Sequence, residues 1–232
     1  MKRLYVAGLA YSLLLALVYA VGQQTPDFMV TFTNLLFPAT AGVAAIFSFS
    51  TLKKYGWIKK AAFFKIWLGF SLGILLWFLG ELTWAVYVLY LDANPYPSLA
   101  DGLYLGGYVF LFLALTLFFR MFQSGFSKTM LGKTALATGA LALIVAHLLF
   151  LPVASSSDDA VTLALDVAYP SLDILLFFFA FAILLIFFRG KVGKAWFFLT
   201  LGVILNVVAD LLFSYAELRG FYYEGHPFEL FW

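Results

Sequence analysis

Cysteine is absent from the chain, so disulfides, thiolate nucleophiles and cysteine-based metal sites are excluded. Histidine occurs only twice, which is too few for the three-histidine zinc site of seven-helix membrane hydrolases. The sequence also lacks a glycine-rich phosphate loop, a His-Glu-x-x-His pair and a Gly-x-Ser-x-Gly elbow. No lysine lies deep in the last apolar run, where a retinal Schiff base would need one. The sequence therefore predicts no metal site and leaves any cofactor undetermined.

Charge is scarce as well. Only 11% of the residues are charged and 64% are hydrophobic, whereas a soluble domain has about 25% charged residues. Apolar runs of 18 or more residues recur along the chain, and each is long enough to cross a hydrocarbon core about 30 Å thick. Because lipid cannot satisfy backbone hydrogen bonds, runs of this length must be helices.

We therefore predict an all-α fold, a polytopic membrane helix bundle of seven transmembrane helices built as helical hairpins. No polar stretch is long enough for a soluble domain, so residues 1–232 form a single integral membrane domain. The predicted spans are 4–22, 28–52, 61–91, 102–120, 134–154, 171–188 and 195–218.

Basic residues are confined to alternate connections between these spans. By the positive-inside rule those connections face the cytoplasm, which predicts a multi-pass protein of the cell membrane with its N-terminus inside and its C-terminus outside. The opposite connections carry most of the acids, and Arg219 is their single basic residue. The thirteen basic residues on the predicted cytoplasmic side are Lys2, Arg3, Lys53, Lys54, Lys59, Lys60, Lys65, Arg120, Lys128, Lys133, Arg189, Lys191 and Lys194.

Two related segments, NPYPSLAD around Pro97 and AYPSLD around Pro170, indicate helix starts at the outer side. In the first, Ser98 and Asp101 have the spacing of a capping box. In the second, Ser171 is predicted to cap a helix, which makes 155–169 an outer loop. Asp173 would then assist the cap, and Asp166 would be a solvated charge. Another proline, Pro227, predicts a further helix from about Phe228.

Two other acids, Glu81 and Asp210, lie inside predicted spans. An ionised carboxylate near the bilayer centre costs about 2.5 to 3.5 kcal/mol, so neither should face lipid. Trp67 and Trp196 each precede one of these acids by 14 residues, which indicates corresponding positions in two helices. We predict that both acids line one cavity open to the outside. The predicted ligand-binding residues are Glu81, Asp210, Trp77, Trp84, Tyr87, Tyr104, His147 and Asn206.

These residues also have a purely structural interpretation. An intramembrane acid that is protonated or hydrogen-bonded holds helices together without binding a ligand. A lone histidine on an apolar helix, such as His147, is usually a core residue. The spacing of Gly69 and Gly73 is a common signal for close helix packing.

Several of these motifs together resemble the multi-pass N-terminal sensor regions of bacterial and archaeal signalling proteins. The resemblance covers about residues 61–232 and depends on Trp77-x3-Glu81-x2-Trp84, NPYPSLADGLYLGGY, DVAYPSLDILL, Trp196-x13-Asp210 and the ending HPFELFW. Such regions precede cytoplasmic diguanylate cyclase or histidine kinase domains, and the resemblance implies a membrane-embedded input module. No output domain is present here, so the chain is expected to be a fragment or a free-standing membrane component.

The predicted function is an integral membrane sensor-like module that recognises a small ligand in an outward-facing pocket and has no catalytic domain. The alternatives are a secondary transporter or proton-coupled carrier and a non-catalytic subunit of a membrane complex. An intramembrane enzyme is disfavoured because no nucleophile or metal triad is visible. The expected partners are the lipid bilayer, a small-molecule ligand, and a membrane or cytoplasmic protein. Nucleic acid is not expected, since the basic loop KKYGWIKK is typical of anchoring to anionic lipid.

Overall fold

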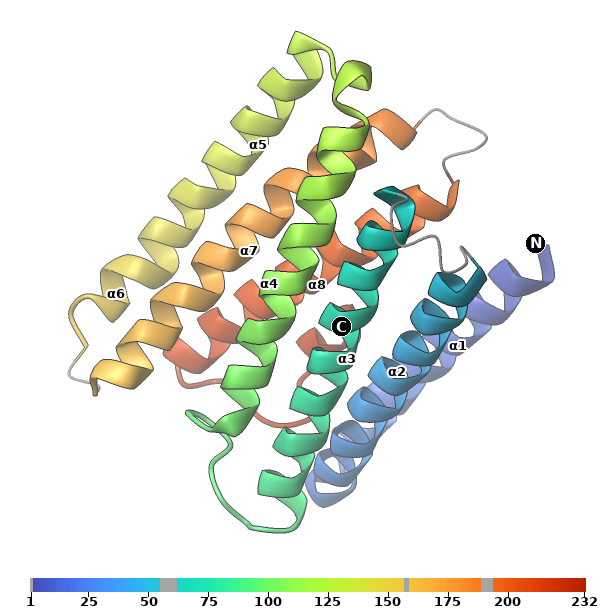
Figure 1. Ribbon diagram of the computed structural model, residues 1–232. Coiled ribbons are helices and arrows are strands. Elements are labelled where there is room, and N and C mark those ends of the chain that lie inside the picture. The colour runs from blue at the N-terminus through green and yellow to red at the C-terminus, as the bar shows by residue number, and fades with distance from the viewer. Residues whose placement is uncertain (1, 55–61, 157–158, 189–193) are drawn as a thin grey trace.

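The computed structural model describes residues 2–54, 62–156, 159–188 and 194–232, and these residues form helices joined by short connections (Figure 1). The basic loop around Trp57 and the residues Asp158, Arg189 and Lys191 lie outside the described residues. The elements are α1 Lys2–Gly22, α2 Pro26–Lys54, α3 Ala62–Leu89, α4 Leu99–Met121, η1 Gln123–Gly125, α5 Lys128–Val145, η2 Ala146–Phe150, α6 Leu151–Val153, α7 Ala160–Phe187, α8 Lys194–Leu218 and η3 Pro227–Phe231.

Six helices in the described part of the chain are long and apolar enough to cross a membrane. The protein is therefore a multi-pass helical membrane protein, as predicted. The six are Pro26–Lys54, Phe63–Leu89, Leu99–Met121, Lys128–Val153, Ala160–Phe187 and Trp196–Leu218. The first predicted span, 4–22, lies within α1, where Ala10–Gly22 is the apolar stretch found among the described residues. The seventh span therefore stays a prediction.

The long helices alternate in direction, so their ends gather at two opposite ends of the bundle (Figure 1). We call one the basic end, defined by Lys53, Lys54, Lys65, Arg120 and Lys128. We call the other the acidic end, defined by Asp27, Asp92, Asp101, Asp159 and Glu217. The charges that the sequence places on alternate connections are thus also segregated in space.

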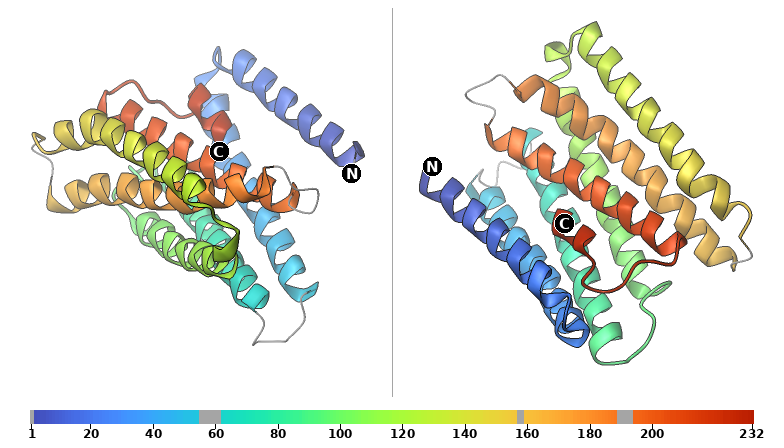
Figure 2. Two further views of the ribbon diagram at one scale, coloured as in Figure 1. Left: turned by 90° about the horizontal axis from the view of Figure 1, so that it is seen from above. Right: turned by 180° about the vertical axis from the view of Figure 1, so that it is seen from behind.

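Two groups of helices make up the bundle. Helix α3 packs between α2 and α4, and α7 packs against α8, α5 and α4. Helix α1 lies at the edge, where it contacts α2 and η3 and leans away from the remaining helices (Figure 2). The contact between α4 and α7 therefore joins the two groups, and hydrogen bonds between tyrosine and aspartate side chains lie along it.

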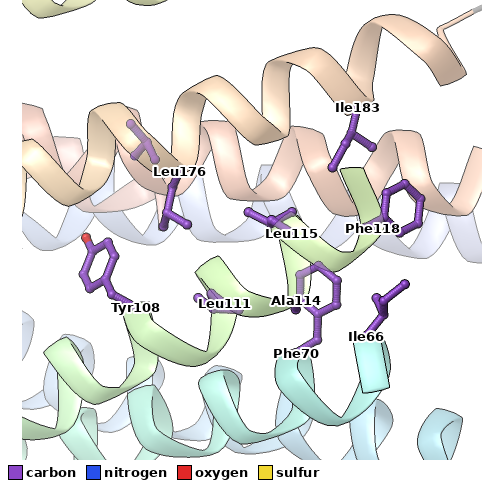
Figure 3. Close-up of a cluster of buried hydrophobic side chains, with 10 residues drawn as sticks. Ile66, Phe70, Tyr108, Leu111, Ala114, Leu115, Phe118, Leu176 and Ile183 are labelled. Atoms are coloured by element: carbon purple, nitrogen blue, oxygen red, sulfur yellow. The ribbon is translucent and has the colours of Figure 1, made fainter. Parts of the chain in front are cut away.

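The hydrophobic core lies where α3, α4, α7 and α8 meet (Figure 3). Its side chains are almost completely excluded from the surface, while many leucines, valines and phenylalanines on the outer faces stay exposed, as lipid contact requires. The core residues are Ile66, Phe70, Tyr108, Leu111, Ala114, Leu115, Phe118, Leu176, Ile183 and Val207.

Glycines allow α3 and α4 to approach closely. A Cβ atom on Gly69 would lie 2.9 Å from the Cβ of Ala114, and one on Gly73 would lie 3.1 Å from the carbonyl oxygen of Gly107. Small residues at such a contact let backbones pack without a side chain between them. The prediction that Gly69 and Gly73 mark a packing face is confirmed.

The predicted helix start at Ser98 is also confirmed. The Ser98 side chain accepts a hydrogen bond from the Ala100 amide, and Asp101 accepts one from the Ser98 amide at 2.6 Å. Both halves of a capping box are therefore present, and Asp101 lies in the first turn, where the helix dipole favours an anion.

The predicted helix start at Ser171 is wrong. Helix α7 begins at Ala160, its N-cap is Asp159, and Pro170 is buried inside the helix. The Ser171 hydroxyl donates instead to the Val167 carbonyl at 2.6 Å. Proline inside a membrane helix is tolerated when nearby hydroxyls satisfy the freed carbonyls. Residues from 160 to 169 are therefore helical, and Asp166 is not a loop residue.

The last fourteen residues, 219–232, fold back into the bundle from the acidic end (Figure 2). We call them the C-terminal segment. Gly220 and Gly225 have φ values of 69° and 86°, which favour glycine, and a Cβ on Gly225 would lie 2.6 Å from the Cβ of Met29. In place of the helix predicted from about Phe228, the segment holds the short 3-10 helix η3.

Candidate functional site

Three hydrogen bonds between tyrosine and aspartate side chains join α7 to α4 and the loop before it. They run from the acidic end toward the interior, and in each pair the tyrosine hydroxyl lies within hydrogen-bonding distance of an aspartate carboxyl oxygen. The pairs are Tyr96 with Asp166 at 2.6 Å, Tyr169 with Asp101 at 2.7 Å, and Tyr108 with Asp173 at 2.6 Å. The two Tyr-Pro-Ser segments thus bond across the interface. Tyr96, in the loop before α4, bonds to Asp166 of α7, and Tyr169 of α7 bonds to Asp101 of α4.

The innermost pair extends to α8. The hydroxyl of Tyr108 lies 2.6 Å from Oδ1 of Asp173 and 3.0 Å from Oδ2 of Asp210. Asp210 also accepts from Nδ2 of Asn206 at 3.3 Å and from the indole Nε1 of Trp232 at 2.6 Å. Tyr108 closes one end of the core and points its hydroxyl toward α7 (Figure 3). One tyrosine therefore links α4, α7 and α8.

Glu81 on α3 faces the same interior region. Its carboxyl has the Tyr104 hydroxyl as a hydrogen-bond partner, and the charges of Asp210, Glu224 and Glu229 act on it through the bundle. A Cβ on Gly80 would lie 2.6 Å from the Tyr104 ring, so this glycine makes room for the tyrosine beside Glu81. That Glu81 and Asp210 line one cavity stays a prediction.

These acids have no cationic partner. Within the described part of the chain, no lysine or arginine forms a salt bridge with Glu81, Asp173 or Asp210, and the described cations lie at the basic end or, for Arg219, near the acidic surface. Their hydrogen-bond donors are hydroxyl, indole and amide groups. The region carries a negative charge that protons or a bound cation must offset.

The predicted aromatic walls lie around this region. Trp77 donates to the Tyr104 carbonyl at 3.2 Å, and its ring centroid lies 5.4 Å from that of Tyr108. Trp84 donates to Glu224 at 3.3 Å. Tyr87 is half-buried near the acidic end of α3. Tyr108 and Glu224 are not among the predicted ligand-binding residues, and Glu224 belongs to the C-terminal segment.

The structure does not bring His147 to this region. It lies in η2, a π-helical turn before Pro152, where the Leu151 amide bonds to the Ala146 carbonyl. Its side chain is exposed, and α5 packs on α7. A histidine can be placed on a helix from sequence, but the face it occupies depends on packing that sequence alone does not provide.

Sequence reasoning also missed three residues of the network. Asp173 is wholly buried, with 0% of its surface exposed, although capping was taken to explain it. Tyr108 and Trp232 belong to segments that carry the family resemblance but are not among the predicted ligand-binding residues. The available signal was the apolar run before Pro170, because a helix that starts eleven residues earlier than predicted, at Ala160, carries Asp173 into the bilayer.

The C-terminal segment is held by a second acidic group, Glu229. Its carboxylate accepts from the hydroxyls of Tyr19 at 2.9 Å and Tyr222 at 2.8 Å, and from the amides of Gly225 at 2.7 Å and His226 at 3.2 Å. These bonds connect α1 to the end of the chain. Beyond them, Trp232 packs between Phe37 of α2 and Phe213 of α8, with centroid distances of 5.6 and 5.7 Å.

We expect the C-terminal segment to be held more firmly at pH 5 than at pH 8. Burial raises the pKa of Glu229 from 4.5 to about 7, so the folded protein binds this proton more tightly than the unfolded chain does. The stabilisation is complete below about pH 4.5 and is lost as the pH rises through about 7, by at most about 3 kcal/mol. Burial also raises the pKa of Glu224, which acts in the same direction.

Hydrogen exchange of the amides of residues 219–232 measures this effect. Protection should fall between pH 5 and pH 8 after correction for the intrinsic exchange rate. In Glu229→Gln, the segment should be less protected at pH 5, and the remaining pH dependence should be smaller. Protection that rises with pH in the wild-type protein would contradict the prediction.

Comparison of the chain with models of protein families, with curated proteins and with solved structures found no match in any of the three.

Proposed function

We propose that the protein is an integral membrane sensor-like module that recognises a small cationic ligand inside the helix bundle, between Glu81 and Asp210. The ligand would enter from the acidic end, which we take to face outward, with seven spans and a cytoplasmic N-terminus. The observation that carries the proposal is the electrostatic interaction of these two acids, on α3 and α8, with no lysine or arginine paired to them in the described residues.

The surroundings support a ligand with both positive charge and apolar surface. Trp77 and Tyr104 lie beside Glu81, and the indole of Trp232 lies on Asp210. Aromatic faces attract cations, and the attraction increases when both partners are desolvated. A ligand that bonds to Asp210 would compete with the Trp232 indole and so move the C-terminal segment. Such a movement provides a two-state element that a ligand could bias.

Ligand-induced thermal stabilisation tests the proposal. A panel of aliphatic amines, aromatic amines and tetraalkylammonium ions is added to the detergent-purified protein. At about 100 times its Kd, a ligand adds about 2.7 kcal/mol to the free energy of unfolding. We expect an amine from the panel to raise the Tm of the wild-type protein and to have no effect on the Glu81→Gln, Asp210→Asn double variant.

Glu217→Gln is the matched control, because Glu217 is exposed on the same helix as Asp210. This control should respond as the wild type does. Equal Tm shifts in the wild type and the double variant would contradict the proposed site, as would a panel in which no amine stabilises the wild type.

A proton-coupled carrier is the second candidate. It is favoured by the correspondence between α3 and α8, in which Trp67 and Trp196 pack at a centroid distance of 5.4 Å while the charges of Glu81 and Asp210 act on each other. Internal repeats with buried acids are common in such carriers. Amine uptake into proteoliposomes that is driven by a pH gradient and abolished by Glu81→Gln would favour the carrier over the sensor.

A further inference from the structure

One hydroxyl group lies within hydrogen-bonding distance of two carboxyl groups. Tyr108 is 2.6 Å from Oδ1 of Asp173 and 3.0 Å from Oδ2 of Asp210. A tyrosine hydroxyl has a single hydrogen, so it can donate to only one of these oxygens. The other contact requires a hydrogen on the carboxyl itself. Two ionised carboxylates and a tyrosine hold only one such hydrogen, whereas the two contacts need two. One of the two carboxyl groups must therefore be protonated.

The surroundings of the two carboxyls indicate where this proton lies. Asp210 has two further donors, Asn206 and Trp232, which stabilise an ionised group. Asp173 is 0% exposed, and its Oδ2 atom is buried with no hydrogen-bond partner. A charged oxygen without water or a donor is very costly, whereas the carbonyl oxygen of a neutral acid is tolerated. Asp173 is therefore the protonated member.

We propose that Asp173, Tyr108 and Asp210 form a proton-binding site in which one proton is shared between the two carboxyl groups through the tyrosine hydroxyl. In this proposed arrangement, the Asp173 Oδ1–H group donates to the oxygen of Tyr108, and the Tyr108 hydrogen is donated to Oδ2 of Asp210. The site goes beyond the ligand recognition proposed above, since it involves α7 and does not depend on what binds at Glu81.

The same three residues can pass the proton from α7 to α8. The O–H bond of Asp173 breaks as a new O–H bond forms on the tyrosine oxygen. The original O–H bond of Tyr108 breaks as one forms on Oδ2 of Asp210. The three groups carry one negative charge before and after, and no other reactant is needed. Loss of the proton would leave two carboxylates on neighbouring helices with one hydrogen between them.

No other ionisable group around Asp173 in the described structure offsets its charge in place of this proton. On α7 itself, the hydroxyl of Tyr169 is donated to Asp101. Glu81 and Tyr104 lie on the Asp210 side. On α5, which also packs on α7, Lys128 and Lys133 lie toward the basic end and His147 is exposed. α6 has no ionisable residue. In the described structure, no cation faces the trio.

Infrared spectroscopy of the full chain in lipid vesicles tests the proposal through the carbonyl stretch of a protonated carboxylic acid. At neutral pH the wild-type protein should show this band, and Asp173→Asn should lose one carboxylic acid per chain. Tyr108→Phe removes the acceptor of the Asp173 proton, so it should shift the band. If Asp173→Asn fails to fold, the band of Tyr108→Phe alone tests the proposal.

Asp159→Asn is the control. Asp159 caps the same helix, its hydrogen bond to Thr162 holds its pKa below the usual range, and asparagine can also cap. This variant should keep the band, and Glu81→Gln identifies any contribution from Glu81. A spectrum without a protonated acid, or a band unchanged by both Asp173→Asn and Tyr108→Phe, would overturn the proposal. The spectra are recorded in choline chloride and again in sodium chloride. Loss of the band in sodium chloride would also overturn the proposal, in favour of a metal cation site.

Discussion

Tyr108→Phe is expected to lower the free energy of unfolding by about 2 to 4 kcal/mol, although it removes a single oxygen atom. The ring would keep its place beside Trp77 and Tyr169, at centroid distances of 5.4 and 6.1 Å. The loss arises because Asp173 has no other hydrogen-bond partner in the described structure and no exposed surface. A buried polar group left without a partner costs about 1 to 3 kcal/mol, and more if it is charged.

Unfolding by SDS titration in mixed micelles measures this loss. Tyr215→Phe is the matched control, since this half-buried tyrosine of α8 packs on Phe221 and its hydroxyl forms no hydrogen bond in the described structure. That variant should change the free energy of unfolding by less than about 0.5 kcal/mol. In the double variant with Asp173→Leu, the loss should be smaller than the sum of the two single losses, because the orphaned acid is then absent. A Tyr108→Phe loss below about 0.5 kcal/mol would contradict the network.

Gly73→Leu is expected to cost about 3 kcal/mol or more, because it forces α3 and α4 apart. The first atom of any side chain at this position would lie 2.7 Å from Cγ of Leu111 and 3.1 Å from the Gly107 carbonyl oxygen. Leu111 is itself buried in the core, and the carbonyl belongs to helical backbone, so neither can move aside cheaply. Overpacking a well-packed core costs about 1 to 3 kcal/mol, and here the helix contact itself is lost.

Gly202→Leu is the control for this substitution. Gly202 lies within α8, and a Cβ there would meet nothing within 4 Å. The same SDS titration should therefore show little loss, or a small gain from the higher helix propensity of leucine. Equal losses at both positions would mean that the close approach of α3 and α4 contributes nothing to stability.

The helices follow from sequence to a large extent, because lipid leaves the backbone few choices. Apolar runs predicted seven spans, six of which are helices long and apolar enough to span in the described part of the chain, and the alternation of charge predicted the two ends of the bundle. The helix start at Ser98 was predictable from the capping box, whose two bonds are local. Local interactions of this kind can be predicted from sequence, because both partners lie within a few residues of each other.

The error at Ser171 shows where local reasoning fails. The letters Tyr-Pro-Ser-Leu occur at both Tyr96 and Tyr169, yet the first proline precedes a helix and the second lies inside one. The difference depends on what precedes each motif. Polar residues before Pro97 favour a loop, whereas Asp159 caps a helix that then runs through Pro170. A motif alone does not decide between these two structures.

The candidate site was predictable only in part. Glu81 and Asp210 stand out because acids within apolar spans are rare. Asp173 was hidden by the misplaced helix start. The pairing of Tyr108 with both aspartates joins residues 65 and 102 positions apart, which no local pattern reveals. The position of His147 depends on how α5 is rotated against α7, which is also a property of the packed bundle.

The bond between Tyr19 and Glu229 has a consequence for biosynthesis. The two residues are separated by 210 positions, so the first helix leaves the ribosome long before its partner has been made. Until then α1 has mainly α2 to pack against. Its final placement must therefore be among the last events of assembly, after the intervening helices have been inserted and have met one another.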